Sequence, residues 1–140
     1  MKSRVALHLA LALMFASCPA AAQGLVVIAN VASGVDKLTR EEAVNIFMGR
    51  YGRLPSGITA LPLDEVGEKA LFYRTLIGKE LPDVNSYRAR LMFSGLGSPP
   101  RQTDNAAEVI ETVVNNKGAI GYIDKAKVDR RVKVILDLSK

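Results

Sequence analysis

Tryptophan is absent from the 140-residue chain, and histidine and cysteine occur once each, as His8 and Cys18. Both residues lie in the first 22 positions, which have the pattern of a segment that is removed on export. The rest of the chain then has no imidazole and no thiol, which excludes Ser-His-Asp and Cys-His catalysis, disulfide bonds and structural zinc. We therefore expect a protein that is not an enzyme and that uses no cofactor or metal.

The first 22 residues contain the three parts of a secretory signal peptide. Lys2 and Arg4 precede an apolar run from Val5 to Ser17, and Ala20-Ala21-Ala22 supplies small residues for a cleavage site. The apolar run is shorter than the roughly 20 residues that cross a membrane. We expect a signal peptide over residues 1–22, a domain over residues 23–140 without a transmembrane segment, and a periplasmic location.

Cys18 offers an alternative end of the leader. The segment Phe15-Ala16-Ser17-Cys18 resembles a bacterial lipoprotein box, in which the cysteine is lipidated and becomes the first mature residue. Phe15 stands where that box usually has leucine, and Pro19 is not a favoured next residue. Cleavage after Ala22 is the prediction, and lipidation at Cys18 stays the alternative.

The charge is modest once the leader is set aside. Removing Lys2 and Arg4 lowers the formal net charge from +5 to +3. The most basic run, Lys125 to Lys133, follows Asp124 and is interrupted by Asp129. On an exported protein this pattern favours a solvated turn over a nucleic-acid surface, so no nucleic-acid partner is expected.

Apolar periodicity predicts an α/β fold over the remaining residues. Strands are expected at 25–29, 58–63, 119–123 and 132–138, and helices at 39–49, 68–77, 82–92 and 106–114, with residues 95–101 as a loop. The run at 25–29 is expected to be buried on both faces, and Pro62 to make the second strand an edge or irregular strand. Strands separated by helices indicate one small domain, a mixed sheet flanked by helices.

Two helices have clear apolar stripes. The last helix repeats apolar residues at helical spacing and is expected to end at Gly118. The preceding helix is expected to bury Val84, Tyr87, Leu91 and Met92.

The loop after the first strand is one candidate ligand site. It begins at Asn30 and contains Ser33 and Gly34. Ligands in open α/β sheets bind at the carboxyl ends of strands, where a hydroxyl and backbone amides can hold a small anion. The alternative is an ordinary connecting loop.

The start of the second helix is another candidate. A helix N-terminus attracts anions, but Asp64, Glu65 and Glu68 already complement its dipole. At an effective dielectric constant of about 20, each carboxylate about 5 Å from a phosphate raises its energy by roughly 3 kcal/mol before screening. Capping by these side chains is favoured over anion binding.

The arginines form a third set. Arg50 and Arg53 flank Tyr51 after a helix end, and Arg88 and Arg90 lie on a helix, where such side chains are usually solvated. Arg101 follows Pro99-Pro100 on a Gly/Pro-rich loop and is kept as a ligand-binding candidate, because arginine makes bidentate bonds to phosphate or carboxylate.

Three segments together carry a family resemblance. They are Leu38–Glu42 leading into Ile46–Tyr51, Phe93–Gly95 leading to Pro99-Pro100-Arg101, and Gly118–Tyr122. In this order and spacing they resemble a short branch of the periplasmic phosphate-binding protein family of ABC transporters, in the type 2 periplasmic-binding superfamily. The resemblance implies the fold of one lobe of such a protein.

The resemblance also implies a ligand site, but this sequence departs from the family's pattern there. Two-lobed members bind the oxyanion between their lobes, and this chain has the length of one lobe, apparently the second. Members carry a Ser-Gly-Thr turn that bonds the phosphate, where this sequence has Val66-Gly67-Glu68 and retains only the glycine. Arg88 stands where the short branch often has tryptophan.

Together these features predict an exported phosphate or oxyanion solute-binding-like protein of an ABC-type phosphate transport system, weak or non-binding on its own. The alternative is a periplasmic protein-interaction module derived from a lobe that has lost its ligand. The expected partners are phosphate or another small oxyanion, and a transporter or other periplasmic protein. The candidate ligand-binding residues are Asn30, Ser33, Gly34, Gly67 and Arg101.

Overall fold

The computed structural model describes residues 24–140, so the expected signal peptide and the alternative at Cys18 lie outside the described residues. Within this part, one sheet contains the strands β1 (Leu25–Asn30), β2 (Leu61–Glu65), β3 (Arg101–Thr103), β4 (Ala119–Asp124) and β5 (Val132–Asp137). The helices are α1 (Arg40–Phe47), α2 (Lys69–Ile77), α3 (Leu81–Phe93) and α4 (Ala106–Asn115), with a 3₁₀ turn at Lys125–Lys127. The predicted α/β fold is confirmed.

The sheet is mixed, with the strand order β3-β2-β4-β1-β5. β1 runs antiparallel to both β4 and β5, whereas β2 runs parallel to β3 and β4. β1 and β2 therefore run in opposite directions. As a result, the loop that follows β1 and the turn that follows β2 leave opposite ends of the sheet.

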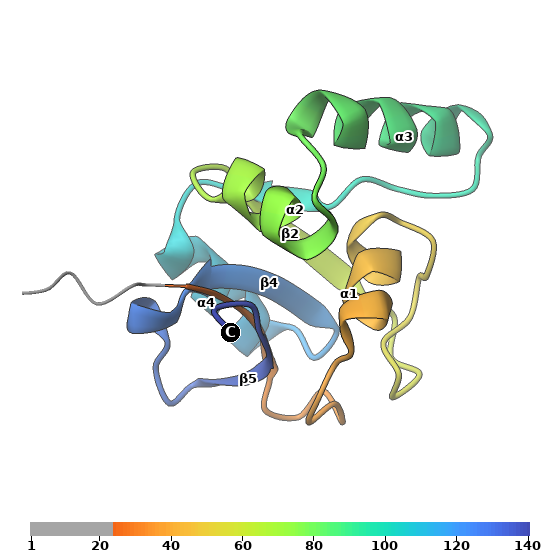
Figure 1. Cartoon of the computed structure of the whole chain (residues 1–140). Helices are drawn as coiled ribbons and strands as arrows, with labels where there is room; N and C mark the ends of the chain where they lie inside the picture. The colour runs from red at the N-terminus through yellow and green to blue at the C-terminus, as the bar shows by residue number, and fades with distance from the viewer. Residues whose placement is uncertain (1–23) are drawn as a thin grey trace, which may run out of the picture.

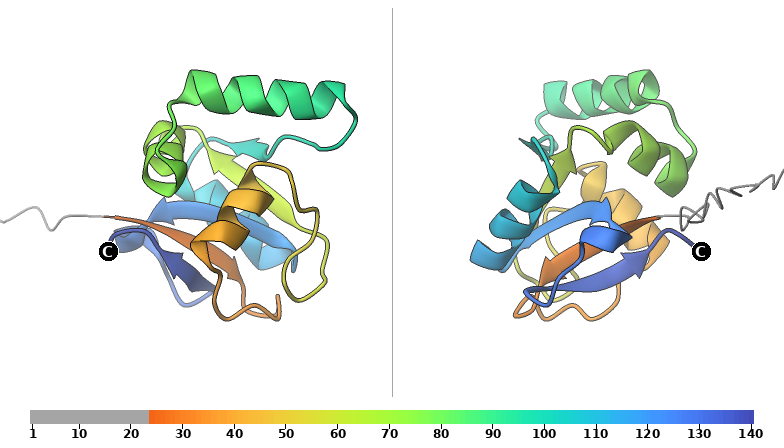
Figure 2. Two further views of the ribbon diagram at one scale, coloured as in Figure 1. Left: turned by 45° about the vertical axis from the view of Figure 1, so that its right-hand side comes forward. Right: turned by 90° about the vertical axis from the view of Figure 1, so that its left-hand side faces the viewer.

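Helices cover both faces of the sheet (Figure 1). α1 and α2 pack on one face over Val27 and Ala29, and α4 packs on the other over Val26 and Ile28. β1 is thus buried on both sides, as its apolar run predicts. α3 lies beyond α2 on the outside of the molecule (Figure 2). No helix within residues 24–140 combines the length and apolarity of a membrane span.

The ends of α1 and α2 follow the predicted local chemistry. The Thr39 hydroxyl accepts a hydrogen bond from the Glu42 amide at 3.1 Å, and the Glu42 carboxylate accepts one from the Thr39 amide at 2.8 Å. This reciprocal capping box satisfies two amides that the helix leaves free. Gly49 and Gly78 follow the two helices with φ of 82° and 67°, a conformation that glycine adopts without steric penalty.

The strand predictions are wrong in two places. Arg101, expected to end a loop, instead begins β3, which was not predicted because its three residues carry too little pattern to signal a strand. β2 spans Leu61–Glu65 and lies inside the sheet, between β3 and β4, instead of at an edge. Pro62 pairs with Ile120 of β4, but the Leu61 N–H group donates on the β4 side, to the Gly118 carbonyl at 2.8 Å. The nitrogen of Pro62 therefore faces the β3 side, where pairing begins only at Leu63 and no N–H group is required.

The expected buried face of α3 is also partly wrong. Val84 is buried, but Met92 is 48% exposed, and the buried polar residue of this helix is Arg88. Gly118 does not end α4 in a left-handed conformation, since the helix ends at Asn115 and the Gly118 φ is not positive. Its lack of a side chain instead allows a close approach, because a Cβ atom there would lie 2.0 Å from the Thr59 carbonyl oxygen.

Candidate functional site

The turn Val66-Gly67-Glu68 joins the end of β2 to the start of α2, where the family resemblance places a phosphate contact. The backbone amide of Gly67 donates a hydrogen bond to Glu65 Oε1 at 2.9 Å, and the Glu65 side chain is buried. The amide of Val66 donates to the carbonyl of Thr103 at 3.0 Å. The amide of Glu68 donates to the carbonyl of Glu65 at 3.1 Å, so all three amides of the turn are bonded within the chain, one of them to a carboxylate.

The carboxylates around this turn have different roles. Glu68 occupies the N-cap position of α2 but accepts no hydrogen bond there with its side chain. Asp64 is fully buried and turns into the core, so the expectation that it caps the helix is wrong. Of the three, only Glu65 contacts an amide of the turn.

Asp64 is the centre of a buried polar cluster. Its Oδ1 atom accepts hydrogen bonds from the hydroxyls of Tyr73 at 2.7 Å and Tyr122 at 3.0 Å. Its Oδ2 atom pairs with Arg88 Nη1 at 3.0 Å, and Lys69 Nζ lies 3.7 Å away. One oxygen of the carboxylate thus has hydroxyl partners and the other has cationic partners, as a buried charge requires.

The two tyrosines of this cluster have shifted ionisation. Burial, followed by the negative charge of Asp64, raises the pKa of Tyr73 well above its usual value of 10.0. The same two causes, in the same order, raise the pKa of Tyr122. Both phenols are therefore hydrogen-bond donors to Asp64 at all ordinary pH values and are not candidate bases.

Arg88 ties α3 to this cluster. Beyond its pair with Asp64, it donates to the carbonyl of Phe47 at 3.1 Å and to the Tyr73 hydroxyl. Its Nε atom is buried without an acceptor. The expectation that Arg88 is solvated is therefore wrong. Its spacing of four from Val84 could have placed it on the buried face, but nothing local identified Asp64 as its partner.

The loop after β1 uses its polar side chains internally. Asn30 Nδ2 donates to the carbonyls of Val113 at 2.8 Å and Val114 at 3.0 Å, which ties the end of β1 to α4. Asn30 Oδ1 accepts from the Ala32 amide at 2.7 Å. Ser33 is fully buried, and its hydroxyl accepts from the Val35 amide at 3.3 Å. Little of this loop is free to hold an anion.

The predicted site residues do not form one site. Gly34, with φ of 74°, lies against Ser56 beyond the end of β1, and Arg101 is exposed on β3 near Leu61, at the start of β2. Gly67 follows the other end of β2. Asn30, Ser33, Gly34 and Arg101 therefore lie toward one end of the sheet and Gly67 at the opposite end, and their ligand-binding roles stay predictions.

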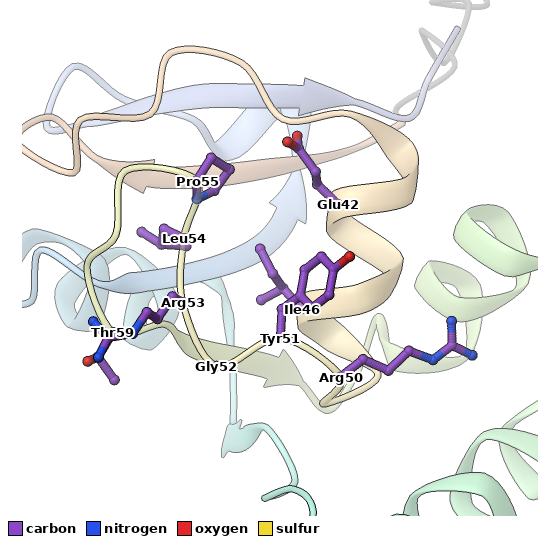
Figure 3. Close-up of a pocket in the computed structure, with 9 residues that line it drawn as sticks. All are labelled: Glu42, Ile46, Arg50, Tyr51, Gly52, Arg53, Leu54, Pro55 and Thr59. Atoms are coloured by element: carbon purple, nitrogen blue, oxygen red, sulfur yellow. The ribbon is translucent and has the colours of Figure 1, made fainter.

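A groove lies between α1 and the loop that leads to β2 (Figure 3). It has a volume of about 630 Å³. Figure 3 shows Ile46 and Tyr51 on the α1 side and Leu54 and Pro55 on the loop side, with Glu42 at one end. The arginines around Tyr51 are visible in the sequence, but the groove is not, because it forms only when the loop packs beside α1.

Solved structures share this fold. An ABC-type phosphate transport receptor from Vibrio cholerae is 22% identical, with a TM-score of 0.65 over 81% of this chain and 45% of the receptor. A phosphate ABC transporter substrate-binding protein from Clostridium perfringens, with bound phosphate, is 18% identical, with a TM-score of 0.63 over 81% of this chain and 44% of that one. PstS from Borrelia burgdorferi is 13% identical, with a TM-score of 0.58, over 81% and 47% of the two chains.

The shared fold shows what kind of protein this chain resembles. The chain spans less than half the length of the solved proteins that it matches, as one lobe of a two-lobed receptor does. Its fold matches one lobe of the substrate-binding proteins of phosphate ABC transporters, which confirms the resemblance seen in the sequence. No protein-family model and no curated protein sequence matches the chain.

Proposed function

We propose that this protein is an exported, solute-binding-like component of an ABC-type transport system for phosphate or another oxyanion. The shared fold with phosphate transport receptors supports this proposal, and so does the leader pattern of residues 1–22. Those neighbours are transport receptors, so we propose no enzymatic activity. Export predicts a mature protein that begins at Gln23, and the intact mass of the secreted product tests this. A mass that fits a lipidated Cys18 would contradict it.

We further propose that the free protein binds phosphate weakly, with a dissociation constant above about 100 μM. The observation that carries this is the hydrogen bond from the Gly67 amide to Glu65 Oε1 at 2.9 Å. A carboxylate of the chain already holds the donor that an incoming anion needs. Glu68 adds a second negative charge in place of a hydroxyl, and a single lobe leaves the ion open to water.

The energy available to such a site is small. A dissociation constant of 1 mM corresponds to only about 4 kcal/mol, which a few exposed charge-assisted hydrogen bonds can supply. Tighter binding needs convergent donors in a desolvated site. Lys69, which directly follows Glu68, and Arg88 both approach Asp64.

Calorimetric titration with phosphate tests the proposal. Val66→Ser combined with Glu68→Thr should tighten binding, because it restores two hydroxyl donors and removes a repulsive charge. Adding Glu65→Ala frees the Gly67 amide and should tighten it further, at least about tenfold in total. Glu41→Ala removes an equal charge from an exposed site on α1 and should have no effect. Micromolar binding by the unmodified protein would contradict the proposal.

A second function, protein interaction, is favoured by the end of α3. Phe93 is 92% exposed and Leu96 is 72% exposed, beside the partly exposed Met92. Three large apolar side chains within five residues form an exposed patch of the kind that marks interaction sites. The patch lies on the outermost helix and the loop after it (Figure 2).

Phosphate uptake by cells that depend on this protein tests the second function. Phe93→Ser combined with Leu96→Ser should lower the uptake rate if this patch binds the transporter. Leu71→Ser removes an exposed apolar side chain from α2 and serves as the control. Unchanged uptake with the double variant would exclude the patch as a contact with the transporter.

A further inference from the structure

The groove of Figure 3 continues toward β3. A second hollow, of about 380 Å³, shares five lining residues with the first and extends along the start of β2 to Arg101. The shared residues are Ile46, Arg50, Tyr51, Gly52 and Thr59. We call the two hollows together the loop groove. It lies at the N-terminal end of β2, whereas the Gly67 turn follows the C-terminal end.

Positive charge predominates along the loop groove. Arg50, Arg53 and Arg101 line it, and Glu42 is the single carboxylate that does so in the described chain. The second hollow is lined by no acidic residue, although Arg101 also borders a neighbouring hollow that contains Glu111. Among residues 24–140, none of these three arginines belongs to an ion pair. Their charges are therefore available to an anion from solution.

The three guanidinium groups differ in how many of their donors are already bonded within the chain. Arg50 Nε donates to the Tyr87 hydroxyl at 2.7 Å, which draws this side chain away from Tyr51, as Figure 3 shows. Arg53 donates one N–H to the Gly57 carbonyl at 2.9 Å and keeps its other donors. Arg101 is exposed, with Thr59 and Ser98 also lining its hollow. Arg53 and Arg101 are thus the best placed to form bidentate bonds to an oxyanion.

The loop groove also offers apolar surface. Ile46 and Leu54 line the hollow but are only 1% and 3% exposed, so the accessible apolar surface comes from the exposed Pro55 and from Tyr51. Tyr51 is about half exposed and presents its ring over Ile46 in Figure 3. Inorganic phosphate would leave this surface unused, whereas a ring or short apolar chain would cover it.

We propose that the loop groove binds a small organic anion, an apolar or aromatic body that carries a phosphate or carboxylate group. The hollow has the size of typical small-molecule pockets, about 300–1,000 Å³, which combine apolar walls with a few placed polar groups. The body packs against Tyr51 and Pro55, and the anionic group bonds Arg53 or Arg101. This site is separate from the Gly67 turn and does not depend on the function proposed above.

Phenyl phosphate is a suitable probe, because it joins a ring to a phosphate group. Calorimetric or NMR titration should show that it binds at least about tenfold more tightly than inorganic phosphate or benzyl alcohol, each of which supplies one half of the recognition. Benzoate is titrated in parallel, and the tighter of the two anions identifies phosphate or carboxylate as the preferred group. Chemical shifts should change at Tyr51 and Thr59 and not at Gly67.

Variants connect the binding to the loop groove. Arg101→Gln, Arg53→Gln and Tyr51→Ala should each weaken binding of the preferred probe by about fivefold or more. Arg130→Gln removes an exposed arginine outside the groove and should leave it unchanged. Glu65→Ala should also leave it unchanged, although the same variant alters binding of inorganic phosphate at the Gly67 turn.

Three outcomes would overturn the proposal. The first is an absence of binding by both phenyl phosphate and benzoate at concentrations up to about 10 mM. The second is equal binding of phenyl phosphate and inorganic phosphate, which would mean that the apolar walls contribute nothing. The third is an equal loss of affinity in Arg130→Gln, which would indicate only a nonspecific attraction to positive charge.

Discussion

Replacing Arg88 by methionine should strongly destabilise the fold. The side chain joins Asp64, the Phe47 carbonyl and the Tyr73 hydroxyl in a buried cluster, and its guanidinium carbon lies 4.6 Å from the centre of the Tyr73 ring. Methionine keeps most of the volume but removes the charge and all these donors. The carboxylate of Asp64 then stays buried without its closest cation.

The expected loss is about 3 kcal/mol of unfolding free energy. Removing one partner of a buried ion pair typically lowers stability by about 3–5 kcal/mol. The lower end applies here for two reasons. Asp64 keeps two tyrosine hydroxyls and Lys69 at 3.7 Å, and the substitution also removes the Nε donor of Arg88, which is buried without an acceptor. Removing a buried donor that has no acceptor regains roughly 1 kcal/mol of unfolding free energy.

Urea unfolding, followed by circular dichroism, measures this loss. With a slope of about 1.5 kcal/mol/M, 3 kcal/mol moves the midpoint by about 2 M. Arg90→Met changes an exposed arginine of the same helix and should shift stability by less than about 0.5 kcal/mol. Adding Asp64→Asn to Arg88→Met removes the carboxylate charge that has lost its arginine partner. This second change should recover about 1 kcal/mol of unfolding free energy. A loss below about 1 kcal/mol in Arg88→Met would refute the reasoning.

Two further predictions concern stability. Ile110→Ala should lower it by about 2–5 kcal/mol, because Ile110 is buried at the centre of the α4 stripe. A change of less than about 0.5 kcal/mol in urea unfolding would show that this face is not core. Because burial raises the pKa of Tyr73 and Tyr122 above 10.0, the unfolded chain loses their protons first. Stability should therefore hold below about pH 10 and fall above it, by up to about 1.4 kcal/mol per pH unit for each tyrosine. Urea midpoints measured at increasing pH above about 10 should fall less steeply in Tyr73→Phe than in the unmodified protein. An identical slope would contradict the raised pKa of Tyr73.

Local pattern was sufficient for most of the secondary structure. The capping box at Thr39 and Glu42, the glycines at 49 and 78 and the stripe of α4 act within a few residues of chain, so the sequence alone determined where these helices lie. The continuous apolar run of β1 likewise determined a strand buried on both faces. The order of short segments across the whole chain was enough to indicate the lobe fold that the solved structures share.

The positions that differ from expectation depend on contacts between distant parts of the chain. Arg88 and Asp64 are 24 residues apart, and Tyr122 is 58 residues from Asp64, so neither partner is visible in the pattern around the other. β3 exists because its three residues pair with β2, not because of their own propensity.

For the candidate ligand residues too, the sequence indicated some features and only the fold decided others. The family resemblance implied Gly67 as an anion contact, and sequence chemistry identified Arg101 and the arginines beside Tyr51 as residues that can bind an anion. Only the antiparallel relation of β1 to β4, combined with the parallel relation of β2 to β4, decided that Gly67 and the loop after β1 lie at opposite ends of the sheet. Strand direction depends on which strands pair, and pairing is a property of the whole folded chain. The tertiary structure therefore separated residues that the sequence had grouped, and brought Arg53 and Arg101 to one groove.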